Sequence, residues 1–284
     1  MRKTLLLGAA FALASTLMLA NTSAHAAAAP VRVEFETMTW PEVKAALAAG
    51  KTTALIYTGG VEQRGPQNAN GGHNLMAREI VKDIALKLGN AIAMPVLPFT
   101  PNQASAEMPG TIGLTNELLE GVLERIAEQT ITNGFKNVVL MGDHGGGQAG
   151  PTNVYAKVAK KLDDKYGAQG IHVFYCDQVY TPANNEFDKQ TEKEGYPASM
   201  HGGLSDTSLM LYLDKDGTWT RKDELKNAIG IPVVDGKPQM NDPKAVKNGI
   251  VGDGRRSSPE LGKRLLDLKV DYAVKQINGF IPKK

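Results

Sequence analysis

Short apolar runs alternate along the chain with longer segments in which apolar positions recur at helical spacing. The short runs predict strands, and the amphipathic segments predict helices. The predicted strands are Thr53–Thr58, Ala91–Leu97, Asn137–Met141 and Ile171–Cys176, and the predicted helices are Trp40–Ala49, Asn74–Leu88, Asn116–Asn133, Pro151–Tyr166, Ser205–Tyr212 and Pro259–Gly279. The polar stretch from Gln178 to Met200 predicts a long loop, interpreted as a lid or an oligomer contact.

The predicted strands are apolar along nearly their whole length, which is typical of strands buried on both faces. Such strands in alternation with helices predict a parallel or mostly parallel sheet covered by helices on both sides, an α/β fold. Ligands bind beyond the carboxyl ends of the strands in folds of this kind. We therefore expect the chemistry of this chain in the loops that follow its strands.

The N-terminus predicts an exported protein. Arg2 and Lys3 precede an apolar run, and Ala24-His25-Ala26 resembles a cleavage site, so residues 1–26 are predicted to be a secretory signal peptide. Residues 27–284 are then expected to form a single domain, periplasmic or secreted. After the signal, no apolar run approaches the ~20 residues needed to cross a bilayer, and we expect no membrane association.

The charge balance and the single cysteine narrow the class of protein. The chain carries 32 basic and 30 acidic residues, and loss of Arg2 and Lys3 with the signal would make it formally neutral. This balance gives no basis for a nucleic acid or an anionic membrane surface as a partner. Cys176 has no second cysteine to pair with, and its apolar strand predicts a buried residue rather than a nucleophile.

Three histidines lie beside glycine pairs, whereas His172 lies inside a predicted strand and is expected to be structural. The three are His73, His144 and His201, and carboxylates that accompany them in the sequence are Glu62, Asp143 and Asp206. Glycine permits tight turns and close approach to a metal or substrate. Imidazoles with one or two carboxylates suit Zn²⁺ or a similar divalent cation. The spacing alone also fits unrelated polar turns, so these residues leave both interpretations open.

Five ordered motifs resemble the creatininase family. They are Glu62-Gln-x-Gly-Pro, Pro109-Gly-Thr-Ile-x-Leu114, the run from Gly134 to Gly146, His201-Gly-Gly-x-x-Asp206-Thr-Ser and Gly249-x-Val-Gly-Asp253. The resemblance implies a three-layer α/β/α sandwich with a mostly parallel central sheet. It also implies metal-dependent hydrolysis of a non-peptide or cyclic C–N amide bond of a small molecule, and a homo-oligomer, commonly a hexamer.

Carried over position by position, the resemblance implies metal-binding roles for Glu62 and His144. It places Asp206 where the family usually has a metal-binding Glu, and it gives His201 the transfer of a proton during amide cleavage. The family's opening motif resembles E-Q-H-G-P-H-x-P-x-G-T-D, from which this chain departs. Arg64 replaces a metal-binding His, His73 replaces the Asp that bridges two metals, and Gln67 replaces the second His.

These departures predict one metal per chain instead of two. Arg64 offers no lone pair to a metal, and its fixed positive charge opposes a second cation. A neutral His73 binds one metal and does not bridge two. Glu62, His73 and His144 would then be the core ligands of one ion, Zn most of all, with Mn or Fe as alternatives. Asp206 is interpreted as a fourth ligand or as the partner of Arg64, and the pairing of Arg64 with Asp206 or with a substrate carboxylate is favoured.

The remaining roles follow from the same interpretation. Arg64, or backbone N–H groups from Gly145 to Gly147, would stabilise the developing oxyanion; the alternative for Arg64 is a solvent-facing loop residue. Asp143 is interpreted either as a carboxylate that orients His144 or as a turn residue. Ser105 lies where many family members have a His, and together with Arg64 and Gln67 this change argues against creatinine as the substrate.

A competing hypothesis is an exported, non-catalytic ligand-binding member of the family with a degenerate metal site. Loss of the bridging carboxylate favours it. Retention of Glu62, His144 and His201, with His73 as a substitute ligand, favours the enzyme. A structural protein without pocket chemistry leaves the glycine-flanked histidines unexplained.

Overall fold

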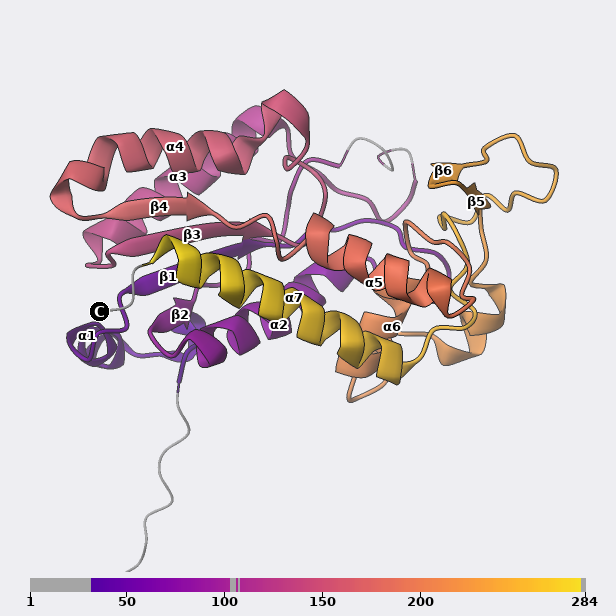
Figure 1. Cartoon of the computed structure of the whole chain (residues 1–284), viewed down its shortest axis with the longest axis horizontal. Coiled ribbons are helices and arrows are strands. Elements are labelled where there is room, and N and C mark those ends of the chain that lie inside the picture. Colours follow the sequence, from indigo (N-terminus) through magenta and orange to yellow (C-terminus); the bar gives the residue numbers. More distant parts are fainter. Residues whose placement is uncertain (1–31, 103–105, 107, 282–284) are drawn as a thin grey trace, which may run out of the picture. The chain divides into compact units, whose positions relative to one another are not determined.

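A four-stranded parallel sheet lies at the centre of the structure, a computed structural model that describes residues 32–102, 106 and 108–281 (Figure 1). In the order β2-β1-β3-β4, the strands are β1 (Thr53–Thr58), β2 (Ala91–Ala93), β3 (Asn137–Gly142) and β4 (His172–Tyr175). In register, Thr53 pairs with Ala91 and Asn137, and Asn137 pairs with His172. The predicted parallel sheet is confirmed.

The second strand is shorter than predicted. Pro95 and Pro98 follow it and lack the N–H group that a strand ladder uses, so β2 ends at Ala93. Leu97 forms only an isolated parallel bridge with Thr58 among the described residues. The chain therefore leaves the sheet early and runs toward the carboxyl end of β1.

The central strands contribute side chains to cores on both faces of the sheet. Leu55 and Tyr57 of β1 lie in one apolar cluster, and Ile56 between them lies in a second cluster on the opposite face. This alternation follows from the two-residue period of a strand. All six residues of β1 are buried, which explains why its sequence lacks the polar alternation of a strand with a solvated face.

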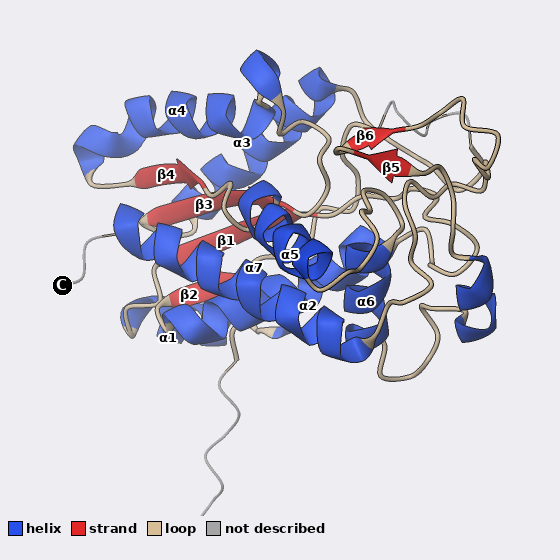
Figure 2. Cartoon of the chain, turned by 45° about the vertical axis from the view of Figure 1, so that its right-hand side comes forward, coloured by secondary structure: helices blue, strands red, loops and turns tan. Residues whose placement is uncertain are grey.

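Helices cover both faces of the sheet (Figure 2). On one face lie α2 (Gly72–Leu88) and α7 (Pro259–Phe280), with α6 (Leu204–Leu213) packed against both; on the other lie α3 (Asn116–Thr132) and α4 (Val154–Tyr166). Local signals fix some helix starts: the side chains of Thr115 and Ser258 accept hydrogen bonds from the first turns of α3 and α7. The three-layer α/β/α sandwich predicted from the sequence is confirmed.

The remaining elements are short. They are α1 (Trp40–Ala48), the strands β5 (Val233–Val234) and β6 (Lys237–Pro238), and the 3₁₀ helices η1 (Phe35–Thr37), η2 (Gly150–Thr152), η3 (Gly167–Gln169) and η4 (Lys222–Asn227). β5 and β6 form an antiparallel hairpin whose turn contains Asp235 and Gly236, both at positive φ. An Asp-Gly pair favours such a two-residue turn.

The prediction of a continuous loop from Gln178 to Met200 is wrong, because α5 (Thr181–Lys193) lies within it. Ala183, Phe187 and Thr191 recur at every fourth position, are buried, and give the helix a narrow inner stripe. The helix packs on α7, and Pro182 occupies its first turn, where proline is favoured. The many polar residues on its outer face hide this stripe in the sequence.

Some sequence predictions fall on residues outside the described ranges. These are the signal peptide at residues 1–26 and the position of Ser105. The chain from Arg32 onward forms one compact unit. No helix in the described part of the chain is long and apolar enough to cross a membrane.

Candidate metal centre

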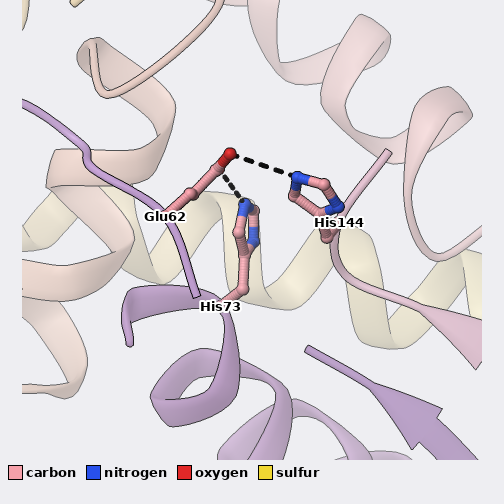
Figure 3. A group of neighbouring side chains, drawn as sticks. All are labelled: Glu62, His73 and His144. Atoms are coloured by element: carbon pink, nitrogen blue, oxygen red, sulfur yellow. Dashed lines mark hydrogen bonds and ion pairs between the residues drawn. The ribbon is translucent and has the colours of Figure 1, made fainter. Parts of the chain in front are cut away.

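Three of the predicted metal ligands converge beyond the carboxyl ends of the central strands (Figure 3). Glu62 follows β1, His144 follows β3, and His73 lies in the first turn of α2. Each offers one ligand atom, and these atoms all lie within 4.8 Å of one another. Adjacent parallel strands bring their following loops to the same edge of the sheet, which is why residues 82 positions apart in the chain meet here.

Both histidines face Glu62 through their Nε2 atoms. His73 Nε2 lies 2.9 Å from Glu62 Oε1, and His144 Nε2 lies 3.1 Å from Glu62 Oε2. The two rings meet edge to face, with centroids 5.0 Å apart and an interplanar angle of 76°. All three side chains are buried. A buried two-histidine, one-carboxylate group of this kind fits a divalent cation.

The charges in the group are set by burial and by hydrogen bonds. Burial alone would raise the pKa of Glu62, but hydrogen bonds with His144 and His73 hold that pKa well below its ordinary value. Burial and the charge of Arg64 oppose protonation of His73, yet hydrogen bonds to Asp143 and Glu62 raise its pKa. Burial lowers the pKa of His144. The surroundings therefore favour the protonated form more at His73 than at His144.

Asp143 holds His73, so the hypothesis that it orients His144 is wrong. Its Oδ2 lies 2.9 Å from His73 Nδ1, and its Oδ1 accepts from Lys269 Nζ at 3.0 Å and from Tyr57 at 3.2 Å. Burial raises the pKa of Asp143, but the charge of Lys269 and the hydrogen bond from His73 lower it well below its ordinary value. A carboxylate on the far nitrogen of a ligand histidine fixes the ring and makes it a better donor.

His144 is held by the chain around it. Thr100 Oγ1 and the Gly146 N–H each lie 3.0 Å from His144 Nδ1. Because Gly146 donates to Nδ1, the neutral ring carries its proton on Nε2 and donates it to Glu62. For Nε2 to bind a metal, the neutral ring would have to carry its proton on Nδ1 instead, and the Gly146 N–H would have to turn away so that Thr100 Oγ1 accepts that proton. A Cβ at position 146 would lie 1.8 Å from the carbonyl oxygen of Pro101, so this approach requires glycine.

Sequence reasoning missed three residues of the centre. Lys269 and Thr100 are described above, and Asn102 Nδ2 donates to Glu62 Oε2 at 2.9 Å. Thr100 and Asn102 come from the segment that follows β2 and carry no motif of their own. Lys269 did carry a signal, since it lies at helical spacing with Leu265 and Ala273 on the buried stripe of α7.

Arg64 is fully buried, which rules out the solvent-facing alternative. Its Nη2 lies 2.5 Å from Asp206 Oδ1, so the favoured pairing of Arg64 with Asp206 is present. None of its N–H groups makes a well-directed hydrogen bond within the described residues. Burial raises the pKa of Asp206, but the Arg64 charge holds it below its ordinary value. Asp206 lies outside the compact Glu62–His73–His144 group.

His201 lies at the wall of the same site with a defined orientation. Its Nε2 is 2.8 Å from the carbonyl oxygen of Gln63, which can only accept, so the proton of a neutral ring lies on Nε2. Its Nδ1 is then an acceptor, and it lies 3.6 Å from Glu62 Oε1. The side chain is 27% exposed. The ring thus presents a base to the space beside the metal ligands.

A cavity of about 930 Å³ opens onto this group. Glu62, His73, His144, His201 and Asp206 line it, whereas Arg64 does not. Arg64 therefore lies behind Asp206 and affects the cavity only electrostatically. The predicted contact of Arg64 with an oxyanion or a substrate carboxylate does not fit this position, and the Gly146 N–H is already bonded to His144.

Cys176 and His172 lie outside the metal centre. Cys176 is buried, and burial raises the pKa of its thiol to about 12, which suits the predicted inert residue. His172 Nδ1 lies 3.0 Å from Asp163 Oδ1, in keeping with a structural histidine.

Lys269→Met is expected to weaken metal binding by about 10–100-fold, the range typical of losing a group that holds a metal ligand in place. Without the ammonium, Asp143 is left as a buried charge with fewer donors, and its hold on His73 changes. Competition titration with a chelating dye measures the affinity, and the visible spectrum of the Co²⁺-loaded protein reports the ligand geometry. Lys263→Met, at an exposed position of the same helix, is the control and should change neither. An unchanged Lys269→Met spectrum and affinity would contradict this role.

The fold and the site together define an α/β/α protein with a Glu–His–His centre suited to a divalent metal. Comparisons with known proteins agree. A sequence model of the creatininase family, described as creatinine amidohydrolase, matches residues 36–277, and this chain belongs to that family. A creatinine amidohydrolase from Pseudomonas putida is 30% identical over 190 residues, which cover 63% of this chain and 71% of the relative.

More distant similarities reach other members. A 3-dehydro-scyllo-inosose hydrolase from Thermotoga maritima is 26% identical over 116 residues, 41% of this chain and 37% of that protein. Among solved structures, a creatinine amidohydrolase (creatininase) superposes with a TM-score of 0.69 at 21% identity, covering 89% of this chain and 99% of that chain. A structure described as creatininase Mn gives a TM-score of 0.71 at 24% identity, covering 89% and 100%. These structural similarities concern the fold.

Proposed function

We propose that this protein is a metal-dependent amidohydrolase that cleaves a non-peptide or cyclic C–N amide bond of a small molecule, with one divalent ion per chain. The observation that carries the proposal is the convergence of Glu62, His73 and His144 at a cavity whose wall also presents His201. Its relatives include hydrolases named for creatinine and for 3-dehydro-scyllo-inosose. These names support hydrolysis as the reaction class.

The buried charges support one ion. Glu62, Asp143 and Asp206 are carboxylates with depressed pKa values, and Arg64 and Lys269 are the buried cations beside them. The three negative charges exceed the two positive charges by one. A single divalent ion reverses this small excess, whereas two would leave three uncompensated positive charges in a buried site, which is costly. Arg64 thus supplies positive charge beside Asp206 that a second metal would otherwise bring.

The residues around the ligands have distinct roles in the proposed reaction. When bound, the ion lowers the pKa of a coordinated water and polarises the amide carbonyl. His201 accepts a proton from the attacking water through Nδ1 and returns it to the leaving nitrogen, because the Gln63 carbonyl oxygen keeps its other nitrogen protonated. Asp143 keeps His73 oriented, and Arg64 keeps Asp206 ionised. Arg64 is therefore a positioning residue in this proposal.

The proposal also covers the identity of the metal ion, the location of the protein and its oligomeric state. Zn is favoured, with Mn or Fe as alternatives; creatininase structures of similar fold are described as Mn and as Zn-Zn type. The sequence of residues 1–26 supports export to the periplasm or beyond. Family membership supports a homo-oligomer, with a hexamer as the expected form.

The metal content of the mature protein tests the proposal. Elemental analysis after dialysis is expected to give about one divalent ion per chain, and the metal-loaded protein should hydrolyse some members of a panel of lactams, formamides and short amides. His201→Ala should keep the metal but lose most of the activity, since general acid–base groups typically contribute about 10²–10⁴-fold. Two ions per chain would contradict the one-ion site. A protein that binds no metal and cleaves no amide would favour the non-catalytic binding protein.

A further inference from the structure

The cavity is much larger than a small cyclic amide requires. Its volume of about 930 Å³ lies near the top of the range of about 300–1,000 Å³ that drug-sized ligands occupy. The metal ligands and His201 make up only a small part of its lining.

Apart from the metal ligands and His201, much of the lining of the cavity is apolar. The apolar side chains that line the cavity are Pro101, Met108, Met200, Ile231, Pro238, Met240, Ile250 and Val251. Met200 and Met240 are 53% and 55% exposed. Exposed large apolar side chains at the mouth of a cavity indicate an apolar ligand, and the flexible thioether of methionine adapts to ligands of varied shape.

Much of this wall comes from one excursion of the chain, residues 229–251, which contains the β5–β6 hairpin (Figure 1). Its two ends are tied to the site: Val251 forms backbone bridges with His201 and with Ile231. The base of the excursion is therefore positioned by the same segment that carries the proposed proton-transfer residue. The excursion contributes Pro238, Met240 and Lys247 to the lining of the cavity.

Lys247 adds a charge to this apolar wall. Among the described residues that line the cavity, it is the one Lys or Arg. It is exposed, and it has no ion pair within the described part of the chain. The carboxylates that line the cavity, Glu62 and Asp206, are already paired with His73, His144 and Arg64. A single cation placed among apolar groups is the arrangement that orients an amphipathic ligand.

We infer that the substrate is an amide with an apolar body and an anionic group, and that the 229–251 excursion selects it. The apolar wall takes the body, and Lys247 pairs with the anion. The inference rests on the proposed function for the position of the reacting amide. It makes Lys247 a specificity residue and leaves the metal ligands and His201 with the chemistry.

The test uses straight-chain probes that vary in two respects: the length of the chain and the group at its end. Hydroxamic acids, which chelate the bound metal, are made with chains of increasing length that end in a carboxylate, a methyl or an ammonium group, and calorimetry measures their affinity for the Zn²⁺-loaded mature protein. The same tails on plain amides are titrated into metal-free protein. Methyl-ended probes should bind several-fold more tightly with each added methylene until the wall is covered. At the best length, the carboxylate end should exceed the ammonium end by roughly fivefold to tenfold.

Substitutions test whether Lys247 itself, and not the overall charge of the protein, sets the preference for the carboxylate end. Lys247→Gln should remove the preference for the carboxylate, and Lys247→Glu should reverse it. Lys244→Gln is the matched control, because Lys244 lies on the same excursion, is exposed and does not line the cavity. Equal affinity for all three ends, or a carboxylate preference that survives Lys247→Glu, overturns the inference even if metal and hydrolysis are present. If the tail preferences hold in metal-free protein but no metal binds, the proposed function fails, while the preference of the cavity for an apolar, anionic ligand stands.

Discussion

Glu62→Gln is expected to lower metal affinity by at least about 100-fold and to abolish amide hydrolysis at micromolar metal. Glutamine keeps nearly the shape of glutamate but removes the one negative charge in the Glu62–His73–His144 group. Loss of an outer partner alone typically costs 10–100-fold in affinity, and a lost ligand costs more. Elemental analysis after dialysis and competition with a chelating dye measure the effect.

The fold of the Glu62→Gln protein shows whether any loss of metal comes from the missing ligand or from a loss of structure. In the metal-free protein, Glu62 accepts from His73, His144 and Asn102, and a neutral amide can still pair with some of these groups, so the far-UV circular dichroism spectrum should be retained. Asp163→Asn is the matched control, because Asp163 forms a carboxylate–histidine pair with His172 away from the centre. It should leave the metal content unchanged. A Glu62→Gln protein that keeps one ion per chain at wild-type affinity would show that the ion lies elsewhere.

The fold could be predicted because its main elements carry strong local signals. The strand Thr53–Thr58 is apolar throughout, and the observed β1 has the same limits. The α5 helix could not be predicted in the same way, since its stripe of Ala183, Phe187 and Thr191 lies within a polar segment. Its helical form depends on packing against α7, and tertiary packing commonly overrides weak local preference.

The centre was predictable where motif and topology agree. His73 and His144 were indicated by the glycines beside them and Glu62 by its motif after β1, and the structure brings the three together. The residues that hold them were not predictable from local pattern. Asp143 adjoins His144 in the sequence but bonds to His73, which lies in the first turn of α2. Lys269 comes from a helix 126 positions after Asp143. Such partners are set by three-dimensional packing, and a lysine on a buried helical stripe is the one sequence signal for them.

Arg64→Met is expected to lower the free energy of unfolding by about 3 kcal/mol, the lower end of the cost of breaking a buried ion pair. Arg64 is fully buried, while the Asp206 side chain is 19% exposed to the cavity, so water relieves part of the uncompensated charge. Urea denaturation of the metal-free protein measures the change. Arg255→Met, which breaks the more exposed Arg255–Asp253 pair, is the control and should cost less than about 1 kcal/mol.

A double-mutant cycle then decides whether Arg64 acts through Asp206. Asp206→Asn alone leaves the guanidinium buried without its counter-charge, so it should also destabilise the protein. The double variant should recover much of the loss, because no buried charge of the pair then remains unpaired. Losses that simply add would show that the two side chains are independent. A coupled pair would mean that Arg64 already neutralises Asp206. A second metal ion would then have no free carboxylate there, which is the physical reason to expect one metal ion per chain.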